Sequence, residues 1–155
     1  MDERINKVMD RLRALCSRRE YCTRDIMKKA LDALDGDKES AQEVVEKLVK
    51  DRYVDDLRYS SAFARDKSSI QGWGAVKIRY ALSAKGIQSD VIAQALEEID
   101  QERSTERLDK LLNTKARALK DDPQRRLKLL RFALGRGYSY DEVESALARL
   151  TKIMT

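Results

Sequence analysis

The sequence predicts an all-α protein of three tandem three-helix repeats that form an elongated, curved molecule. Two observations argue against a β-rich fold: the 155 residues contain only six glycines and one proline, and the apolar positions follow helical spacing. A third observation is a repeat, because Gly36, Gly86 and Gly137 are separated by 50 and 51 positions. A period of about 50 residues leaves room for three helices per repeat, and such repeats stack on their neighbours.

The first repeat is expected to cover residues 1–54. Gly36 follows a helical pattern and can take the left-handed conformation that closes a helix. Ser40 and Glu43 predict a capping box, because each side chain can accept a free backbone N–H at the helix start. The expected helices are about 3–16, 23–34 and 40–51, with core residues Ile26, Val44 and Leu48.

The second repeat is expected to cover residues 55–100. Its paired aspartates, Asp55 and Asp56, could suggest a metal or acid–base site, but no third carboxylate follows nearby. An N-cap for the next helix is the simpler interpretation, with Gly86 and Ser89 marking the last helix boundary. The expected helices are about 56–68, 74–85 and 89–99, with core residues Val76, Ile92 and Leu96.

The third repeat is expected to cover residues 101–155. Asp122-Pro123 predicts an N-cap followed by proline at the first helical position. Ser139 and Glu142 predict a second capping box just after Gly137. The expected helices are about 104–119, 123–135 and 140–152, with core residues Leu127, Val143 and Leu147. Apolar plugs are expected at three helix corners, formed by Tyr53, Ile87 and Tyr138.

The composition argues against several functional classes. Histidine is absent, which removes the usual general base, the Ser-His and Cys-His pairs and most zinc sites. Cys16 and Cys22 cannot complete a structural zinc site alone, so we expect two reduced, mostly buried thiols. No apolar run is long enough to span a membrane, and the N-terminal segment is charged throughout. We therefore expect a cytoplasmic monomer without a cofactor, and an enzyme is the weakest hypothesis.

The net charge of +5 comes from the last third of the chain. Residues 1–55 contain 13 basic and 13 acidic side chains, residues 56–100 contain six of each, and residues 101–155 contain 13 and 8. A cluster of cationic side chains can bind a row of phosphates or an acidic protein surface, whereas a single cationic side chain is usually just part of the solvent-exposed face of a helix. The candidate contacts with a partner or DNA are Arg58, Arg65, Lys67, Lys77, Arg79, Lys85, Arg125, Arg126, Lys128, Arg131 and Arg136.

Trp73 is a further candidate contact, because it stands between two glycines in a polar loop. Its ring could stack on a base or anchor a partner protein. The alternative is a ring folded back over the helix junction, with the glycines allowing the turn, and this alternative is favoured because most large aromatic side chains are packed.

Three stretches of the chain together carry a family resemblance. They are Tyr53-Val54-Asp55-Asp56-Leu57-Arg58-Tyr59 with Ala62-Phe63-Ala64-Arg65, then Gly72 through Leu82 with Lys85-Gly86-Ile87 and Ala95-Leu96, and last Arg131-Phe132-Ala133-Leu134 with Arg136-Gly137-Tyr138. In this order they resemble the RecX regulators of the bacterial RecA recombinase, most strongly over residues 50–98. Two positions depart from the family: Arg52 stands where glycine is usual, and Ala75 stands where proline is frequent.

The resemblance implies three three-helix repeats and a non-enzymatic regulator. It implies binding in the groove of the RecA–single-stranded-DNA filament, with modulation of recombinase, ATPase and co-protease activity, inhibition being the direction expected over mild stimulation. The basic faces could also contact single- or double-stranded DNA directly. The alternative hypothesis is a stand-alone helical transcription regulator, since a three-helix unit with a basic second helix also suits duplex DNA.

Overall fold

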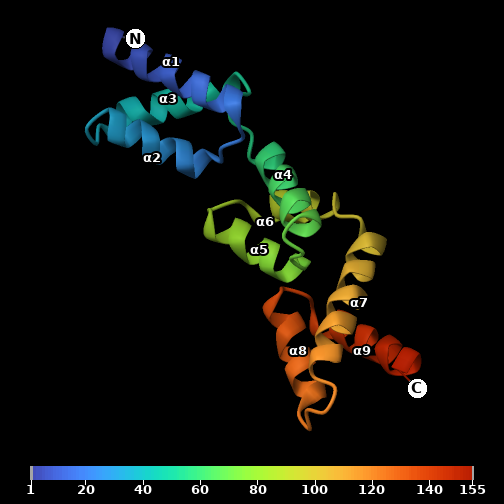
Figure 1. The fold of residues 1–155 in the computed structure, drawn as a ribbon. Helices are drawn as coiled ribbons and strands as arrows, with labels where there is room; N and C mark the ends of the chain where they lie inside the picture. Colours follow the sequence, from blue (N-terminus) through green and yellow to red (C-terminus); the bar gives the residue numbers. More distant parts are fainter. Residues whose placement is uncertain (1, 155) are drawn as a thin grey trace. The chain divides into compact units, whose positions relative to one another are not determined.

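A computed structural model of the chain describes residues 2–154, with side chains described as far as residue 151. The described residues form helices and connecting turns without any β-strand, which confirms the all-α class (Figure 1). The helices are α1 (Glu3–Arg18), α2 (Thr23–Ala33), α3 (Lys38–Lys50), α4 (Asp56–Ser69), α5 (Ala75–Ala84), α6 (Ser89–Leu96), α7 (Gln101–Ala118), α8 (Arg125–Gly135) and α9 (Tyr140–Met154).

The chain divides into two compact units that interleave along the sequence. The first unit contains residues 1–62 and 82–95, and the second contains residues 63–81 and 96–155. Helices α4 and α5 therefore each contribute residues to both units. Repeat boundaries at residues 54 and 100 stay a prediction.

The core of the first unit lies among α1, α2 and α3, which pack together (Figure 1). Each helix contributes an apolar stripe at three- and four-residue spacing, and the stripes face one another. The largest fully buried side chains of this core are Met9, Ile26, Leu34, Leu48, Val44 and Val54.

The core of the second unit lies among α7, α8 and α9. Leu108 and Leu112 of α7 pack with Leu129 of α8 and Val143 of α9, all at most 3% exposed. The predicted plug Tyr138 fills the corner between α8 and α9 and is 1% exposed. Burial raises the pKa of its hydroxyl.

Local signals for helix ends are confirmed in part. Gly36, Gly86 and Gly137 all have positive φ, of 84°, 77° and 95°. Ser139 and Glu142 form the predicted capping box, with N–H···O distances of 2.9 and 3.1 Å.

Three predicted caps are wrong. The cap of α3 is Asp37, which accepts the backbone N–H of Ser40, because the helix begins at Lys38. Ser89 is the first residue of α6 rather than its cap. Asp122 and Pro123 form a turn in which Asp122 accepts the Gln124 N–H at 2.8 Å, and α8 begins only at Arg125.

Two predicted core residues are also wrong. Val76 is 45% exposed and Leu127 is 41% exposed, whereas Ile78 and Leu129 are buried two positions later in the same helices. The glycine repeat is regular, but the buried positions of α5 and α8 are shifted by two residues relative to those of α2 when the three helices are aligned on their glycines.

Asp55 and Asp56 both cap helices, but different ones. Asp55 accepts the backbone N–H of Arg58 at 3.0 Å, which confirms its predicted cap role. Asp56 instead accepts the N–H and hydroxyl of Thr23 at 2.7 and 3.0 Å, at the start of α2. Cys22, the residue before α2, supplies no side-chain cap, so a carboxylate 33 positions away satisfies this helix end.

Candidate partner-binding surface

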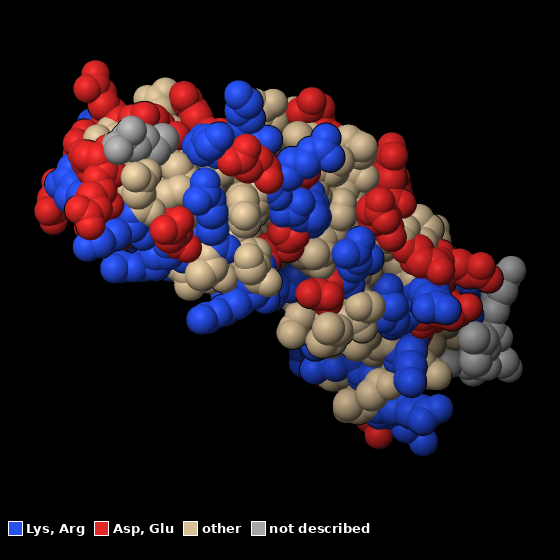
Figure 2. Space-filling view, turned by 90° about the horizontal axis from the view of Figure 1, so that it is seen from above, with Lys and Arg blue, Asp and Glu red and all other residues tan. Residues whose placement is uncertain are grey.

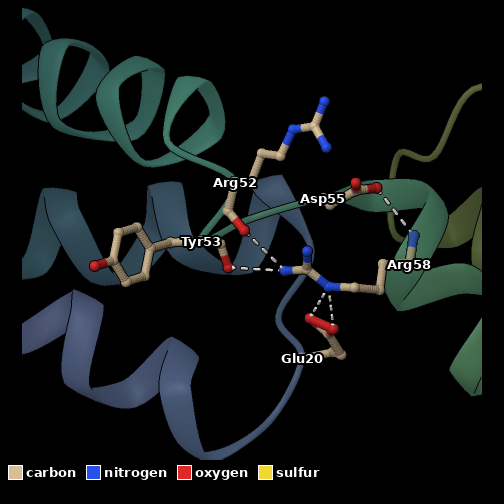
Figure 3. Close-up of polar contacts among 5 residues, drawn as sticks. All are labelled: Glu20, Arg52, Tyr53, Asp55 and Arg58. Carbon is tan, nitrogen blue, oxygen red and sulfur yellow. Dashed lines mark hydrogen bonds and ion pairs between the residues drawn. The ribbon is translucent and has the colours of Figure 1, made fainter.

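Arg58, a predicted contact, is bonded within the first unit. It forms an ion pair with Glu20 and donates to the carbonyls of Arg52 and Tyr53 at 3.1 and 3.3 Å (Figure 3). The hydrogen bond to Glu20 raises the pKa of Arg58 above its usual value. The guanidinium therefore holds the corner after α3 against the loop between α1 and α2, and its role in partner binding stays a prediction.

Lys85 is also paired within the first unit. Its Nζ lies 3.1 Å from Asp25 Oδ2, and this hydrogen bond raises the pKa of Lys85. Beside it, Arg24 donates to the Ala84 carbonyl at 2.8 Å. Both cations hold the end of α5 against the start of α2, so their charge is partly neutralised or committed to the backbone.

Trp73 in the second unit is partly packed against its own chain and partly available to a ligand. Its ring packs edge-on against Phe63, with ring centroids 6.2 Å apart, and the residue is half-buried. Lys67 and Lys77 place their ammonium groups 4.7 and 4.3 Å from the Trp73 ring centroid. Neither lysine forms an ion pair in the described part of the chain, so the ring and both charges remain together as a basic aromatic surface.

Two glycines hold the Trp73 loop against the corner between α8 and α9. Gly74 donates to the Arg136 carbonyl at 2.8 Å, and Val76 donates to the Gly137 carbonyl at 2.9 Å. A Cβ at Gly74 would lie 2.4 Å from the Gly137 carbonyl, and a Cβ at Gly137 would lie 2.2 Å from Lys77 Cβ. Only glycine fits at either position, so this contact fixes the loop that carries Trp73.

A cavity of about 560 Å³, the α7–α8 pocket, lies in the same unit. Ile70, Leu111 and Phe132 supply apolar surface, and the cationic residues that line it are Arg107, Lys110, Lys115 and Arg136. The Lys115 ammonium and the Arg136 guanidinium lie 5.2 and 5.4 Å from the Phe132 ring centroid. Of these residues the sequence analysis predicts only Arg136. The helical spacing of residues 107, 111, 115 and 118 is a signal for the α7 side of the pocket, whereas no local signal points to Ile70 or Phe132.

The predicted cations of α8 are more dispersed. Arg126 pairs with Glu144 at 2.7 Å, Lys128 pairs with Asp122, and Arg125 donates to the Ala116 carbonyl at 2.8 Å. Arg131 is exposed, as is Arg79 of α5.

Figure 2 shows acidic and basic side chains interleaved on the face it draws. Arg65 is 4.0 Å from Glu98, so it too has an acidic neighbour.

The described residues offer little for metal or thiolate chemistry. They contain no group of three histidine, cysteine or carboxylate side chains placed to hold a metal ion. Burial raises the pKa of the thiols of Cys16 and Cys22, which favours the neutral form. In the same part of the chain, no helix has the length and hydropathy needed to cross a bilayer.

The fold and the surface together define an all-helical protein of three-helix domains, in which cationic side chains lie against aromatic rings in both units. Residues 55–96 match the family model described as the second three-helix domain of RecX, and residues 101–147 match the one described as its third. The chain belongs to the RecX family of regulatory proteins.

Individual relatives agree with this assignment. A regulatory protein RecX from Clostridium botulinum is 34% identical over 115 residues, covering 72% of this chain and 53% of the relative. One from Bacillus mycoides is 33% identical over 110 residues, covering 70% and 41%. The chain thus spans about half the length of such curated relatives.

Solved structures show the same fold. The crystal structure of RecX from Lactobacillus salivarius superposes with a TM-score of 0.87 at 22% identity, covering 97% of this chain and 99% of that one. A second crystal structure of regulatory protein RecX gives 0.84 at 25% identity, covering 94% and 72%.

Proposed function

We propose that this chain regulates the RecA recombinase by binding in the groove of its filament on single-stranded DNA and inhibiting it, without catalysing a reaction. The observation that carries the proposal is the match of residues 55–96 and 101–147 to two consecutive RecX domains. The expected effects are lower recombinase, ATPase and co-protease activity.

The surface of the second unit supports this proposal physically. A bound protein shifts the equilibrium between assembled and dissociated filament only if it binds the two states with different affinity. A basic aromatic surface suits a nucleoprotein filament, because cations attract phosphates and acidic side chains while a half-buried ring adds apolar contact. Lys67, Trp73 and Lys77 are the members of the candidate set that the structure brings together in this way.

The test is a titration of the purified chain into RecA assembled on single-stranded DNA while ATP hydrolysis is measured. We expect the hydrolysis rate to fall as the chain is added, with a parallel loss of filament length by electron microscopy. An unchanged rate and unchanged filaments at saturating protein would overturn the proposal.

A control without RecA measures binding of the chain to duplex and single-stranded DNA. We expect weak binding that decreases with salt and does not depend on sequence. Tight, sequence-selective binding to duplex DNA would favour the stand-alone transcription regulator instead.

A further inference from the structure

The α7–α8 pocket combines apolar surface with a single sign of charge. Four of its lining residues are cationic, and none of the described lining residues is an aspartate or glutamate. Its volume of about 560 Å³ falls in the range of pockets that hold small ligands or peptide side chains. The charge complement of such a site is an anionic ligand with an apolar group.

The pocket cations are not neutralised by neighbouring carboxylates. Arg107 donates to the hydroxyl of Ser68 at 2.8 Å, and Arg136 approaches the Gln71 carbonyl at 3.5 Å. Lys110 and Lys115 form no ion pair within the described residues. A carboxylate-bearing ligand would therefore meet cations whose charge is unopposed.

The apolar part of the pocket favours an aliphatic group over a nucleobase. Phe132 is its aromatic residue, and the cations of Lys115 and Arg136 already lie against that ring. A base would have to displace them to stack. An aliphatic side chain can instead pack on Leu111, Ala118 and Ile70, the last of which is 72% exposed.

We propose that the α7–α8 pocket binds an acidic peptide segment that carries one bulky aliphatic side chain. The aliphatic side chain enters between Ile70 and Leu111, and the flanking carboxylates face Lys110, Lys115, Arg107 and Arg136. This recognition goes beyond the proposed function, because it concerns a peptide of stated chemistry and its test contains no RecA.

The test uses fluorescence anisotropy with a labelled twelve-residue peptide of Asp and Glu that has one central Leu. The pocket variant is K110E/K115E, and the matched control is R117E/K120E, which makes the same charge change on exposed residues of α7 and the turn after it, outside the pocket. We expect at least a tenfold weaker affinity in the pocket variant and a change under twofold in the control. Ile70→Ser, an exposed substitution, should weaken binding several-fold without affecting the fold.

Two further probes complete the test. Replacing the central Leu of the peptide by Ser should weaken binding to the native chain at least fivefold, and oligothymidine of equal charge should compete poorly. The proposal is overturned if no peptide binds, if the control loses as much affinity as the pocket variant, or if the Leu and Ser peptides bind equally. It is also overturned if the native chain binds oligothymidine more tightly than the peptide and K110E/K115E no longer binds oligothymidine, since the pocket would then be a nucleic-acid site.

Discussion

The two units place their candidate contact cations in different surroundings. In the first unit, Arg58 is paired with Glu20 and Lys85 with Asp25. In the second unit, Lys67 and Lys77 lie over Trp73 and form no ion pair among the described residues. An exposed ion pair contributes little to stability and largely cancels the field of both charges, whereas a cation over a ring keeps its charge for a ligand. Other candidate cations of the second unit, Arg65, Arg126 and Lys128, do have carboxylate neighbours. On the difference at Lys67 and Lys77 we propose that partner binding involves the second unit.

The corners of the two units also differ. Arg52 in the first unit adopts φ of 63°, so a side chain is accommodated in the left-handed region there. Gly137 in the second unit has φ of 95°, and its backbone meets Lys77 so closely that no Cβ fits. The second corner is therefore a close contact of two backbones, whereas the first is a turn held by the Arg58 side chain.

The largest expected effect is that of Gly137→Ala. The added methyl group overlaps Lys77 and the backbone is strained, so we expect a loss of about 3 kcal/mol or more in the free energy of unfolding. Gly36→Ala is the matched control: its φ of 84° is similar, but no atom lies within 4 Å of the added Cβ, and about 1 kcal/mol is expected. Urea unfolding followed by circular dichroism measures both, and equal losses would contradict the close contact.

The next effect concerns binding. The double variant K67Q/K77Q removes two cations beside Trp73 that have no ion pair among the described residues. We expect about a tenfold rise in the concentration that half-inhibits RecA, from the loss of two lysine contacts with the filament worth roughly 0.7 kcal/mol each. The matched control is R19Q/K29Q in the first unit, where Arg19 and Lys29 lie 4.5 and 5.6 Å from the Tyr21 ring centroid.

This control removes the same charge from the same kind of contact, so a change under twofold is expected. The melting temperature of both variants should stay near that of the native chain. If R19Q/K29Q weakens inhibition as much as K67Q/K77Q, net charge rather than position determines binding, and the comparison between units fails.

Arg58→Ala should act on stability instead. It removes the ion pair with Glu20 and the hydrogen bonds to two carbonyls of the α3–α4 corner, at an expected cost of about 1 kcal/mol. Thermal unfolding measures the loss, and Arg79→Ala, on an exposed side chain, is the control. A large loss of RecA inhibition with unchanged stability would instead place Arg58 in the binding surface.

The smallest effect is a gain. Arg52 adopts a left-handed backbone conformation that costs an arginine about 1 kcal/mol or more, and Arg52→Gly removes this cost. Part of the gain is lost because glycine makes the unfolded chain more flexible. We expect a net gain of about 0.5 kcal/mol, detectable as a higher urea midpoint with unchanged slope. A lower midpoint would mean that the Arg52 side chain itself stabilises the corner.

The sequence predicts what short-range chemistry determines. The Ser139 and Glu142 box and the left-handed glycines depend on residues within one turn of each other, and both predictions are confirmed. The Asp56 cap on Thr23 joins residues 33 positions apart, and the contact of Gly74 with Gly137 joins residues 63 apart. Such contacts depend on how the helices pack, and helix packing cannot be predicted from a short stretch of sequence.

In the candidate site, too, short-range features are predictable from the sequence and long-range contacts are not. The glycine neighbours of Trp73 mark it as a candidate contact in the sequence, but nothing local marks Lys67 and Lys77 as partners of its ring rather than members of a general basic set. The α7–α8 pocket was missed because its residues come from the α4–α5 loop, α7 and the end of α8. Arg58 and Lys85 have the same charge as Lys67, and only their positions beside carboxylates distinguish them.

Photo-crosslinking to RecA filaments from one aromatic position in each unit tests most directly whether the second unit binds the partner. A benzoylphenylalanine replaces Trp73 in one variant and Tyr21 in the other, since both rings carry two nearby cations. We expect a covalent product with RecA from position 73 and little or none from position 21. A product from position 21 in the absence of one from position 73 would mean that the first unit, not the second, lies against RecA.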